Sequence, residues 1–383
     1  MAKNENLNSA AKAKNDEFYT QFDDINKELN CYLEYDKNIF RDKTILLPCD
    51  DPQFSNFTQF FALKFEEYGL KKLISTSYAV NSKKFRMPVQ LSLFEQNFPQ
   101  YDPTIDDLRG KIYTLDNESI KTNKYPPDAL QWEYLEGDGD FRSDEVKKLR
   151  DEADLIITNP PFSMFREFLK WILEADKKFL IIGNINCITY KEVFPLIMQN
   201  KIWLGNGMGR WISGFIVPEG YELYCTEARI NKYGERIVAT NQCLWLTNLE
   251  HGRRHQPTEF NSMADNIKHC RHKDVKESGI LYKKYDNYDA IEVPYFDLIP
   301  SDYEGVMGVP ITFLNRYCPE QFEILGMTEN LDLYGLKTKI YTTQECKDQY
   351  FKLFGKKGTY DLNAAGVING RKVYQRILIR YRR

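Results

Sequence analysis

The chain has 383 residues, of which 42% are apolar and 28% charged, with a formal net charge of −3 at pH 7. This composition excludes a disordered chain, and the length allows one large domain with a smaller second one. The eight cysteines include no Cys-x-x-Cys pair, which argues against a disulfide framework or zinc ribbon. No run is apolar and long enough for a signal peptide or membrane span. We therefore expect a cytoplasmic protein with no membrane partner.

Strand-like and helix-like segments alternate through the first half of the chain. Apolar runs predict strands at 43–47, 72–77, 153–158 and 178–182. Helical spacing of apolar residues predicts helices at 57–68, 144–151 and 163–173. This order is typical of an α/β fold with a parallel, doubly wound sheet. Strand-like pieces at 211–217 and 243–247 are expected to close the sheet with an antiparallel edge.

Three further segments depart from this alternation. Residues 80–130 are too long for an ordinary connection and predict an insertion, with a small hairpin at 110–115. Residues 251–290 are polar and basic, which indicates a linker or long loop. The remainder has mixed elements, with a buried strand expected at Ile377–Ile379 together with Tyr374. We accordingly predict a domain at 1–250 and a second region at 251–383.

The tetrapeptide Asn159-Pro160-Pro161-Phe162 follows the strand predicted at 153–158. It therefore stands at the carboxyl end of a strand, where open α/β sheets bind their ligands. The two prolines keep the backbone extended, which puts the Asn159 amide beside the Pro160 carbonyl. Such a pair can accept both hydrogens of an exocyclic amino group. The alternative is a proline-stiffened loop without chemistry.

Charge is distributed unevenly along the chain. From residue 351 onward nine Lys or Arg residues accompany a single acid, Asp361, whereas acidic residues gather near predicted strand ends in the first half. A basic region joined to an acidic cleft suits a polyanion held beside a cofactor site. The alternative is an ordinary solvated basic surface.

Several motifs are spread over nearly the whole chain: Asn15–Gln21, Cys49–Pro52, Gly137–Phe141, Asn159–Phe162, Thr247–His251, Gly308–Leu314 and Arg376–Arg380. Together they resemble the EcoRI-type family of DNA adenine-N6 methyltransferases, which depend on S-adenosylmethionine, and this resemblance implies a protein of a bacterial or phage-infected cell. The resemblance implies a Rossmann-like methyltransferase domain at 1–250 and a mixed α+β region for target-DNA recognition at 251–383. It also implies site-specific methyl transfer to the N6 of a flipped-out adenine, as in restriction-modification, by a monomer on double-stranded DNA.

The resemblance also implies roles for individual residues. Asn159, Pro160, Pro161 and Phe162 would form the catalytic motif, with Phe162 stacking on the target base. The residues that would bind S-adenosylmethionine are Tyr19 and Thr20 at its methionine end, Asp50 or Asp51 at its amine or ribose, and Asp140 and Phe141 at its adenine. One departure is that no Gly-x-Gly turn follows the first strand, and no acid for the ribose hydroxyls ends the second. The ribose contact therefore stays unassigned.

The basic residues are expected to contact DNA phosphates. This set comprises Arg253, Arg254, Arg371, Lys372 and Arg376. The motif alone leaves other planar amino groups open, namely those of RNA, cytosine N4 or a protein glutamine. A catalytically silent DNA-binding protein is the alternative from another class.

Two smaller features remain. Gln90, Leu91, Leu93 and Phe94 resemble the short peptide that docks on the replication sliding clamp, and the alternative is a strand that packs on its own domain. All four histidines, His251, His255, His269 and His272, fall in one basic stretch. We expect this stretch to contact phosphate rather than to hold a metal, because ligand spacing is poor and the neighbouring cations would repel one.

Overall fold

A computed structural model of the chain describes residues 19–51, 55–79, 101–102, 104–122, 132–206, 212–217, 228–238, 243–278 and 281–382. Its contacts divide the chain into two compact units. Unit 1 comprises Met1–Ile197 and Lys201–Gly252, and unit 2 comprises Met198–Asn200 and Arg253–Arg383. None of the described helices is long and apolar enough to cross a membrane.

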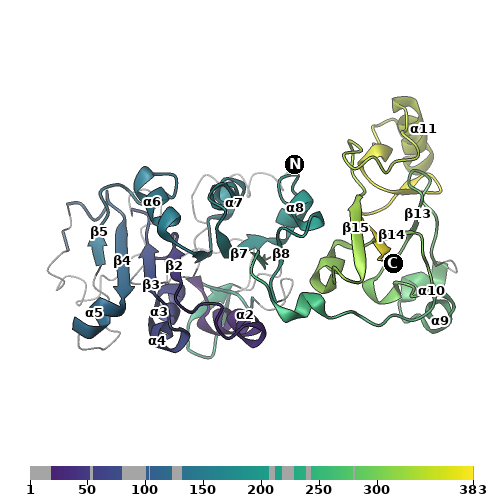
Figure 1. Cartoon of the computed structure of the whole chain (residues 1–383). Helices are drawn as coiled ribbons and strands as arrows, with labels where there is room; N and C mark the ends of the chain where they lie inside the picture. The colour runs from purple at the N-terminus through teal and green to yellow at the C-terminus, as the bar shows by residue number, and fades with distance from the viewer. Residues whose placement is uncertain are drawn as a thin grey trace. The chain divides into compact units, whose positions relative to one another are not determined.

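Unit 1 is built on a mixed sheet of eight strands, so the predicted α/β class is confirmed (Figure 1). In sheet order the strands are β5 (Trp132–Tyr134), β4 (Lys111–Asp116), β3 (Lys72–Thr76), β2 (Thr44–Leu47), β6 (Leu155–Thr158), β7 (Lys178–Asn184), β12 (Cys243–Thr247) and β8 (Trp203–Leu204). The four central strands, β3, β2, β6 and β7, are parallel. The outer strands on both sides pair antiparallel, including β12 on β7 as predicted.

Helices cover both faces of this sheet. Figure 1 shows α6 (Asp144–Glu152) and α7 (Phe165–Glu174) on one side, and α3 (Asn56–Leu63) and α4 (Phe65–Tyr68) on the other. The apolar stripe of α7 is buried, which is why this segment packs as a helix against the sheet. The single helix expected at 57–68 is instead interrupted at Lys64, and it ends as predicted at Gly69, whose φ of +63° is left-handed.

Two other interpretations of unit 1 change. Residues 110–115 are not a hairpin on an insertion, because β4 is a strand of the main sheet. Residues 215–216 form β9, which lies in a second sheet. That sheet has the order β1 (Tyr19–Thr20), β9 (Phe215–Ile216), β11 (Arg236–Val238) and β10 (Ala228–Ile230). The further helices of unit 1 are α2 (Phe22–Tyr35), α5 (Asn117–Thr122) and α8 (Phe194–Met198), with 3-10 turns η3 (Phe162–Met164) and η4 (Ile185–Thr189).

The described part of unit 2 has a four-stranded sheet, a separate hairpin and three helices. The sheet has the order β13 (Ala290–Glu292), β14 (Val306–Val309), β18 (Ile377–Tyr381) and β15 (Phe322–Met327). The hairpin consists of β16 (Val367–Ile368) and β17 (Arg371–Lys372), and the helices are α9 (Met263–His269), α10 (Lys273–Ser278) and α11 (Thr343–Phe354). The 3-10 turns are η5 (Gly252–His255), η6 (Phe296–Leu298), η7 (Ile311–Arg316) and η8 (Leu362–Ala364).

Two predictions about this region need correction. Residues 251–290 are not a simple linker, because α9 and α10 lie within them and Ser262 caps α9 by accepting from Asp265. The buried strand at Ile377–Ile379 is confirmed as part of β18. Tyr374 does not belong to it, because its side chain is 83% exposed.

Candidate active site

The Asn159-Pro160-Pro161 segment leads from the carboxyl end of β6 into η3, which begins at Phe162. Pro161 has φ −56° and ψ 122°, an extended conformation that no helix could continue. Asn159 is half-buried and Pro160 buried. Among the described residues none donates a hydrogen bond to the Pro160 carbonyl, so this oxygen can accept one from a ligand.

Asp50 connects three elements around this point. Its carboxylate, on a side chain that is 5% exposed, accepts from Ser55 Oγ at 2.6 Å and from Thr158 Oγ1 at 2.6 Å. Ser55 is the N-cap of α3, and Thr158 is the last residue of β6, directly before Asn159. Asp50 therefore fixes the end of β6 against β2 and α3, which is a positioning role.

Thr20 also contacts the start of α3. Its carbonyl accepts from Asn56 Nδ2 at 2.8 Å, and its backbone pairs with Phe215 of β9. The Phe162 ring packs against Phe215, with ring centroids 6.3 Å apart. The buried Thr20 hydroxyl makes no hydrogen bond within the described part of the chain. The structure thus brings Thr20, Asp50, Asn159 and Phe162 into one site. The Thr20 hydroxyl is available there for a hydrogen bond to a ligand.

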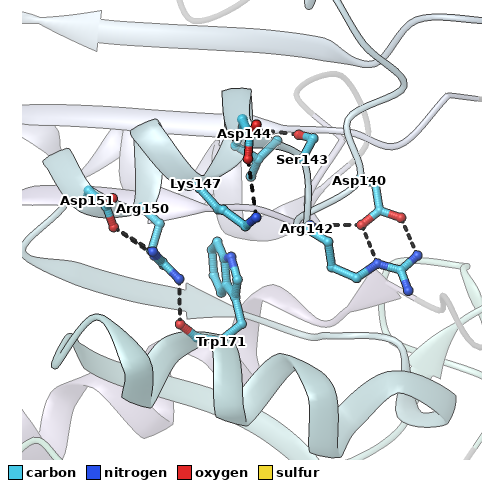
Figure 2. Close-up of polar contacts among 9 residues, drawn as sticks. Asp140, Arg142, Ser143, Asp144, Lys147, Arg150, Asp151 and Trp171 are labelled. Carbon is cyan, nitrogen blue, oxygen red and sulfur yellow. Dashed lines mark hydrogen bonds and ion pairs between the residues drawn. The ribbon is translucent and has the colours of Figure 1, made fainter.

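Asp140 has a partner that the sequence reading missed. Arg142 donates from Nε to one carboxylate oxygen at 2.9 Å and from Nη2 to the other at 2.5 Å, as Figure 2 shows. The Asp140 loop is nevertheless held at the end of β3, because Ala79 N donates to the Asp138 carbonyl at 2.8 Å. In the sequence Arg142 lies two residues after Asp140, and this spacing could have indicated the ion pair.

The ring of Phe141 packs against α7 rather than lying at an open surface. It is 5% exposed and makes edge contacts with Phe168 and Trp171, at centroid distances of 5.1 and 5.6 Å. Arg150 of α6 also donates to the Trp171 carbonyl at 2.9 Å (Figure 2). This burial argues against the expectation that the Phe141 ring packs on a cofactor adenine.

The structure adds a polar group that sequence reasoning did not find. The Asp24 carboxylate of α2 accepts from Ser213 N at 2.8 Å and Ser213 Oγ, and Gln21 donates to Ser213 Oγ at 2.7 Å. Burial raises the pKa of Asp24, although the Ser213 hydrogen bonds oppose that shift. These contacts hold 212–217, and so Phe215, beside Thr20. The pairing joins residues 189 positions apart, for which the sequence carries no signal.

The predicted phosphate contacts divide into two groups. Arg253, Arg371 and Lys372 are exposed. Arg254 is 8% exposed and donates to Asn200 Oδ1 at 3.0 Å. Arg376 donates to Glu292 Oε1 from Nη2 at 2.6 Å and from Nε at 2.8 Å. The interior placement of Arg254 and Arg376 argues against phosphate contacts by either.

The remaining candidates fall outside the site or outside the described residues. Gln90, Leu91, Leu93 and Phe94 belong to 80–100, which the structure does not describe. Tyr19 begins β1, and Asp51 is half-buried one residue past Asp50. The histidines do not converge: His251 contacts the Leu204 carbonyl, His255 pairs with Glu320 and His272 with Asp297. Within the described ranges, no group of three or more His, Cys, Asp or Glu side chains is placed to hold a metal.

Comparisons with known proteins agree on one family. The family model described as adenine-specific methyltransferase EcoRI matches residues 6–382. The type II methyltransferase M.EcoRI of Escherichia coli is 47% identical over 331 residues, covering 86% of this chain and 91% of the relative. The type II methyltransferase M.MgeORF184P of Mycoplasma genitalium is 32% identical over 380 residues, covering 98% of each chain. The type II methyltransferase M.MpnI of Mycoplasma pneumoniae is 32% identical over 339 residues, covering 88% of this chain and 90% of the relative. No solved structure matches the chain. The chain therefore belongs to the family of EcoRI adenine-specific methyltransferases.

Proposed function

We propose that the site at the end of β6 transfers a methyl group from S-adenosylmethionine to the exocyclic N6 of adenine in double-stranded DNA. Methylation of adenine is the activity of the family to which the chain belongs. The observation that carries the proposal is the pair of acceptors at this strand end, the Asn159 amide and the Pro160 carbonyl. As the relatives are type II methyltransferases, we infer a site-specific enzyme of a restriction-modification system.

The chemistry requires positioning more than a strong base. The lone pair of the adenine amino group is delocalised into the ring, so the nitrogen is a poor nucleophile. Asn159 Oδ1 and the Pro160 carbonyl would accept its two hydrogens and draw the nitrogen toward tetrahedral geometry, which directs the lone pair out of the ring plane. Phe162 would stack on the base after it leaves the duplex. S-adenosylmethionine supplies the activated methyl group when it is bound.

The arrangement of unit 1 supports a Rossmann-like reading of its sheet. The chain runs from β2 to β3 on one side and returns to β6 on the other side of β2. In open α/β sheets the crevice at such a reversal binds the ligand, at the carboxyl ends of the strands. Asp50 follows β2 and Asn159 follows β6, so both stand at this crevice.

The residues present fit S-adenosylmethionine at this point. Thr20 offers the buried hydroxyl without a described partner, which suits the methionine carboxylate. Tyr19, Asp51 and Asp140 remain proposed contacts. An Asp140 carboxylate that holds Arg142 still has lone pairs for an amino group. We assign Asp50 to positioning, since both its oxygens already accept hydrogen bonds.

We further propose that unit 2 recognises the target DNA and that the enzyme acts as a monomer. Exposed Arg253, Arg371 and Lys372 would contact phosphates.

Docking on a sliding clamp through Gln90–Phe94 is also retained as a proposal. Replacing Leu93 and Phe94 by Ala should remove binding to purified clamp in calorimetry without reducing methylation of short duplexes. Unchanged clamp binding would refute that role.

Substitution of Asn159 tests the proposed chemistry. Asn159→Ala should lower methyl transfer to DNA at least about 100-fold, since one of the two acceptors is lost. Binding of S-adenosylmethionine, measured by calorimetry, should stay near that of the unchanged enzyme. Asn159→Asp keeps an acceptor oxygen and should retain part of the activity, whereas Asn330→Ala, at an exposed position in unit 2, should have no effect.

The modified nucleoside decides between the alternatives. Mass spectrometry of digested host DNA should find N6-methyladenine when the chain is expressed and none with Asn159→Ala. N4-methylcytosine would indicate the cytosine alternative, and methylated RNA or protein with unmodified DNA would indicate the others. Full activity of Asn159→Ala would contradict the assigned role of this residue.

A further inference from the structure

Unit 2 contains a pocket of about 610 Å³ that none of the site residues above explains. It opens between α10, the residues that follow at 281–283, helix α11 and the β16–β17 hairpin. The side chains that matter are Lys283, Gln349, Lys352, Asn369 and Arg371, which come from three separate segments of unit 2.

The pocket has an excess of uncompensated positive charge. Its cations are Lys283, Lys352 and Arg371, and within the described part of the chain none of them is engaged in an ion pair. Of the two carboxylates in the lining, Glu292 is already matched by Arg376 and by the Tyr285 hydroxyl. Only Asp274, which accepts from the Tyr295 hydroxyl at 2.9 Å, opposes the three cations. The pocket therefore suits an anionic ligand.

The hairpin beside the pocket is held rigidly. Asn369 and Gly370 have φ values of +51° and +69°, so they form a two-residue turn between β16 and β17. Asp286 fixes this turn by accepting from Asn369 N at 3.2 Å and Gly370 N at 2.7 Å. A Cβ atom at Gly370 would overlap the Gln349 amide, so α11 lies directly against the turn.

Two amide side chains therefore stand together with the cations at one pocket. The side chains of Gln349 and Asn369 make no hydrogen bond to any described residue. Amides can donate and accept at an adenine edge, and Lys or Arg can bind phosphates. A two-stranded hairpin also fits the width of the DNA major groove.

We propose that this pocket is a sequence-reading site for duplex DNA, in which Lys283, Lys352 and Arg371 bind the phosphate backbone and Gln349 and Asn369 contact base edges. The proposal rests on the proposed function, because it takes DNA as the substrate. It assigns target choice to α11 and the 367–372 hairpin, a role that charge counting along the sequence could not locate.

The cations are tested first, by DNA binding of the full chain at several salt concentrations. Lys352→Ala and Arg371→Ala should each weaken binding several-fold and reduce the slope of log affinity against log salt by about one. Lys347→Ala is the matched control, because Lys347 is an exposed cation on the opposite face of the same helix. Equal losses in the control, or no loss in either pocket variant, would overturn the proposal.

The role of the Gln349 and Asn369 side chains is tested by the DNA sequence that each variant methylates. Gln349→Ala removes one amide, and Asn369→Gly removes the other while it keeps a residue that tolerates positive φ. Single-molecule sequencing of DNA from expressing cells should show that these variants accept more than one base at a position that the unchanged enzyme reads strictly. An unchanged motif would refute base contact by the pocket.

The two proposals fail in different ways. If the unchanged enzyme leaves DNA without N6-methyladenine, the proposed function itself is wrong. If it methylates a defined motif and all pocket variants do the same with equal affinity, only the pocket assignment is wrong. An unfolding transition by circular dichroism equal to that of the unchanged enzyme separates a loss of DNA contact from unfolding of unit 2.

Discussion

The Asp50 carboxylate is enclosed by two hydroxyl donors, and this single group joins the ends of two strands to the start of a helix. Ser55 and Thr158 each donate to it at 2.6 Å. Two adjacent acids at the end of a strand are readily interpreted as ligand contacts. The hydrogen bonds from Ser55 and Thr158 show that Asp50 also has a structural role. Its neighbour Asp51 is half-buried.

Removal of the Asp50 carboxylate should destabilise unit 1. Asp50→Ala leaves two buried hydroxyl groups without their acceptor, which we expect to cost about 3 kcal/mol of unfolding free energy. Asp51→Ala should cost less, because the Asp51 side chain is half-buried rather than buried. Urea denaturation followed by tryptophan fluorescence measures both, because all five tryptophans lie in unit 1. Equal stability of the two variants would contradict the structural role of Asp50.

Secondary structure elements show where sequence patterns succeed. The central strands could be predicted because strands buried on both faces are continuous apolar runs, as in β2 and β6. Helix α2 escaped prediction because Asp24 and Glu28 occupy its buried face, which breaks the apolar spacing. Helices α9 and α10 are only seven and six residues long, too short for a clear period.

The same contrast applies to the candidate site. Asn159 and Phe162 could be placed from a local motif, because the strand, the prolines and the helix adjoin in sequence. Asp24 and Ser213 could not, since only the paired strands β1 and β9 bring them together. The pairing of Arg376 with Glu292 was likewise hidden, because a count of charges along the sequence does not show which of them meet in the fold.

The loop after β5 depends on close contact between backbones. Gly139 has φ +80°, and a Cβ atom there would overlap the Ser77 carbonyl oxygen beyond β3. Gly139→Ala should therefore cost about 2 kcal/mol or more, and it should weaken S-adenosylmethionine binding by displacing Asp140. Gly137→Ala is the matched control, because its Cβ would lie 3.6 Å from Glu145 Oε2, an ordinary contact. Calorimetric binding that is equal in both variants would exclude this loop from the cofactor site.

At the scale of the whole molecule, the two units offer separate spectroscopic signals. Unit 1 contains every tryptophan of the chain, whereas unit 2 is rich in tyrosine and has none. Tryptophan fluorescence therefore reports on unit 1 alone. Far-ultraviolet circular dichroism reports on both, so a change confined to unit 2 is recognisable by comparison of the two signals.

This difference allows a decisive test of Arg376. Its guanidinium and the Glu292 carboxylate are each 12% exposed, and Glu292 also accepts from the Tyr285 hydroxyl. Burial and Glu292 raise the pKa of Tyr285 well above its ordinary value, so this hydroxyl remains a donor. Arg376→Ala would leave the Glu292 charge buried without its cation, which should cost unit 2 about 3 kcal/mol.

The expected result is an earlier unfolding transition by circular dichroism with the tryptophan transition unchanged. Arg371→Ala, an exposed cation on the nearby hairpin, should leave both transitions within about 0.5 kcal/mol and weaken only DNA binding. If Arg376→Ala instead kept full stability and lost DNA affinity with a lower salt slope, Arg376 would be a phosphate contact after all. The two arginines carry the same charge and lie five residues apart in sequence. A difference between their variants would therefore come from burial and not from charge.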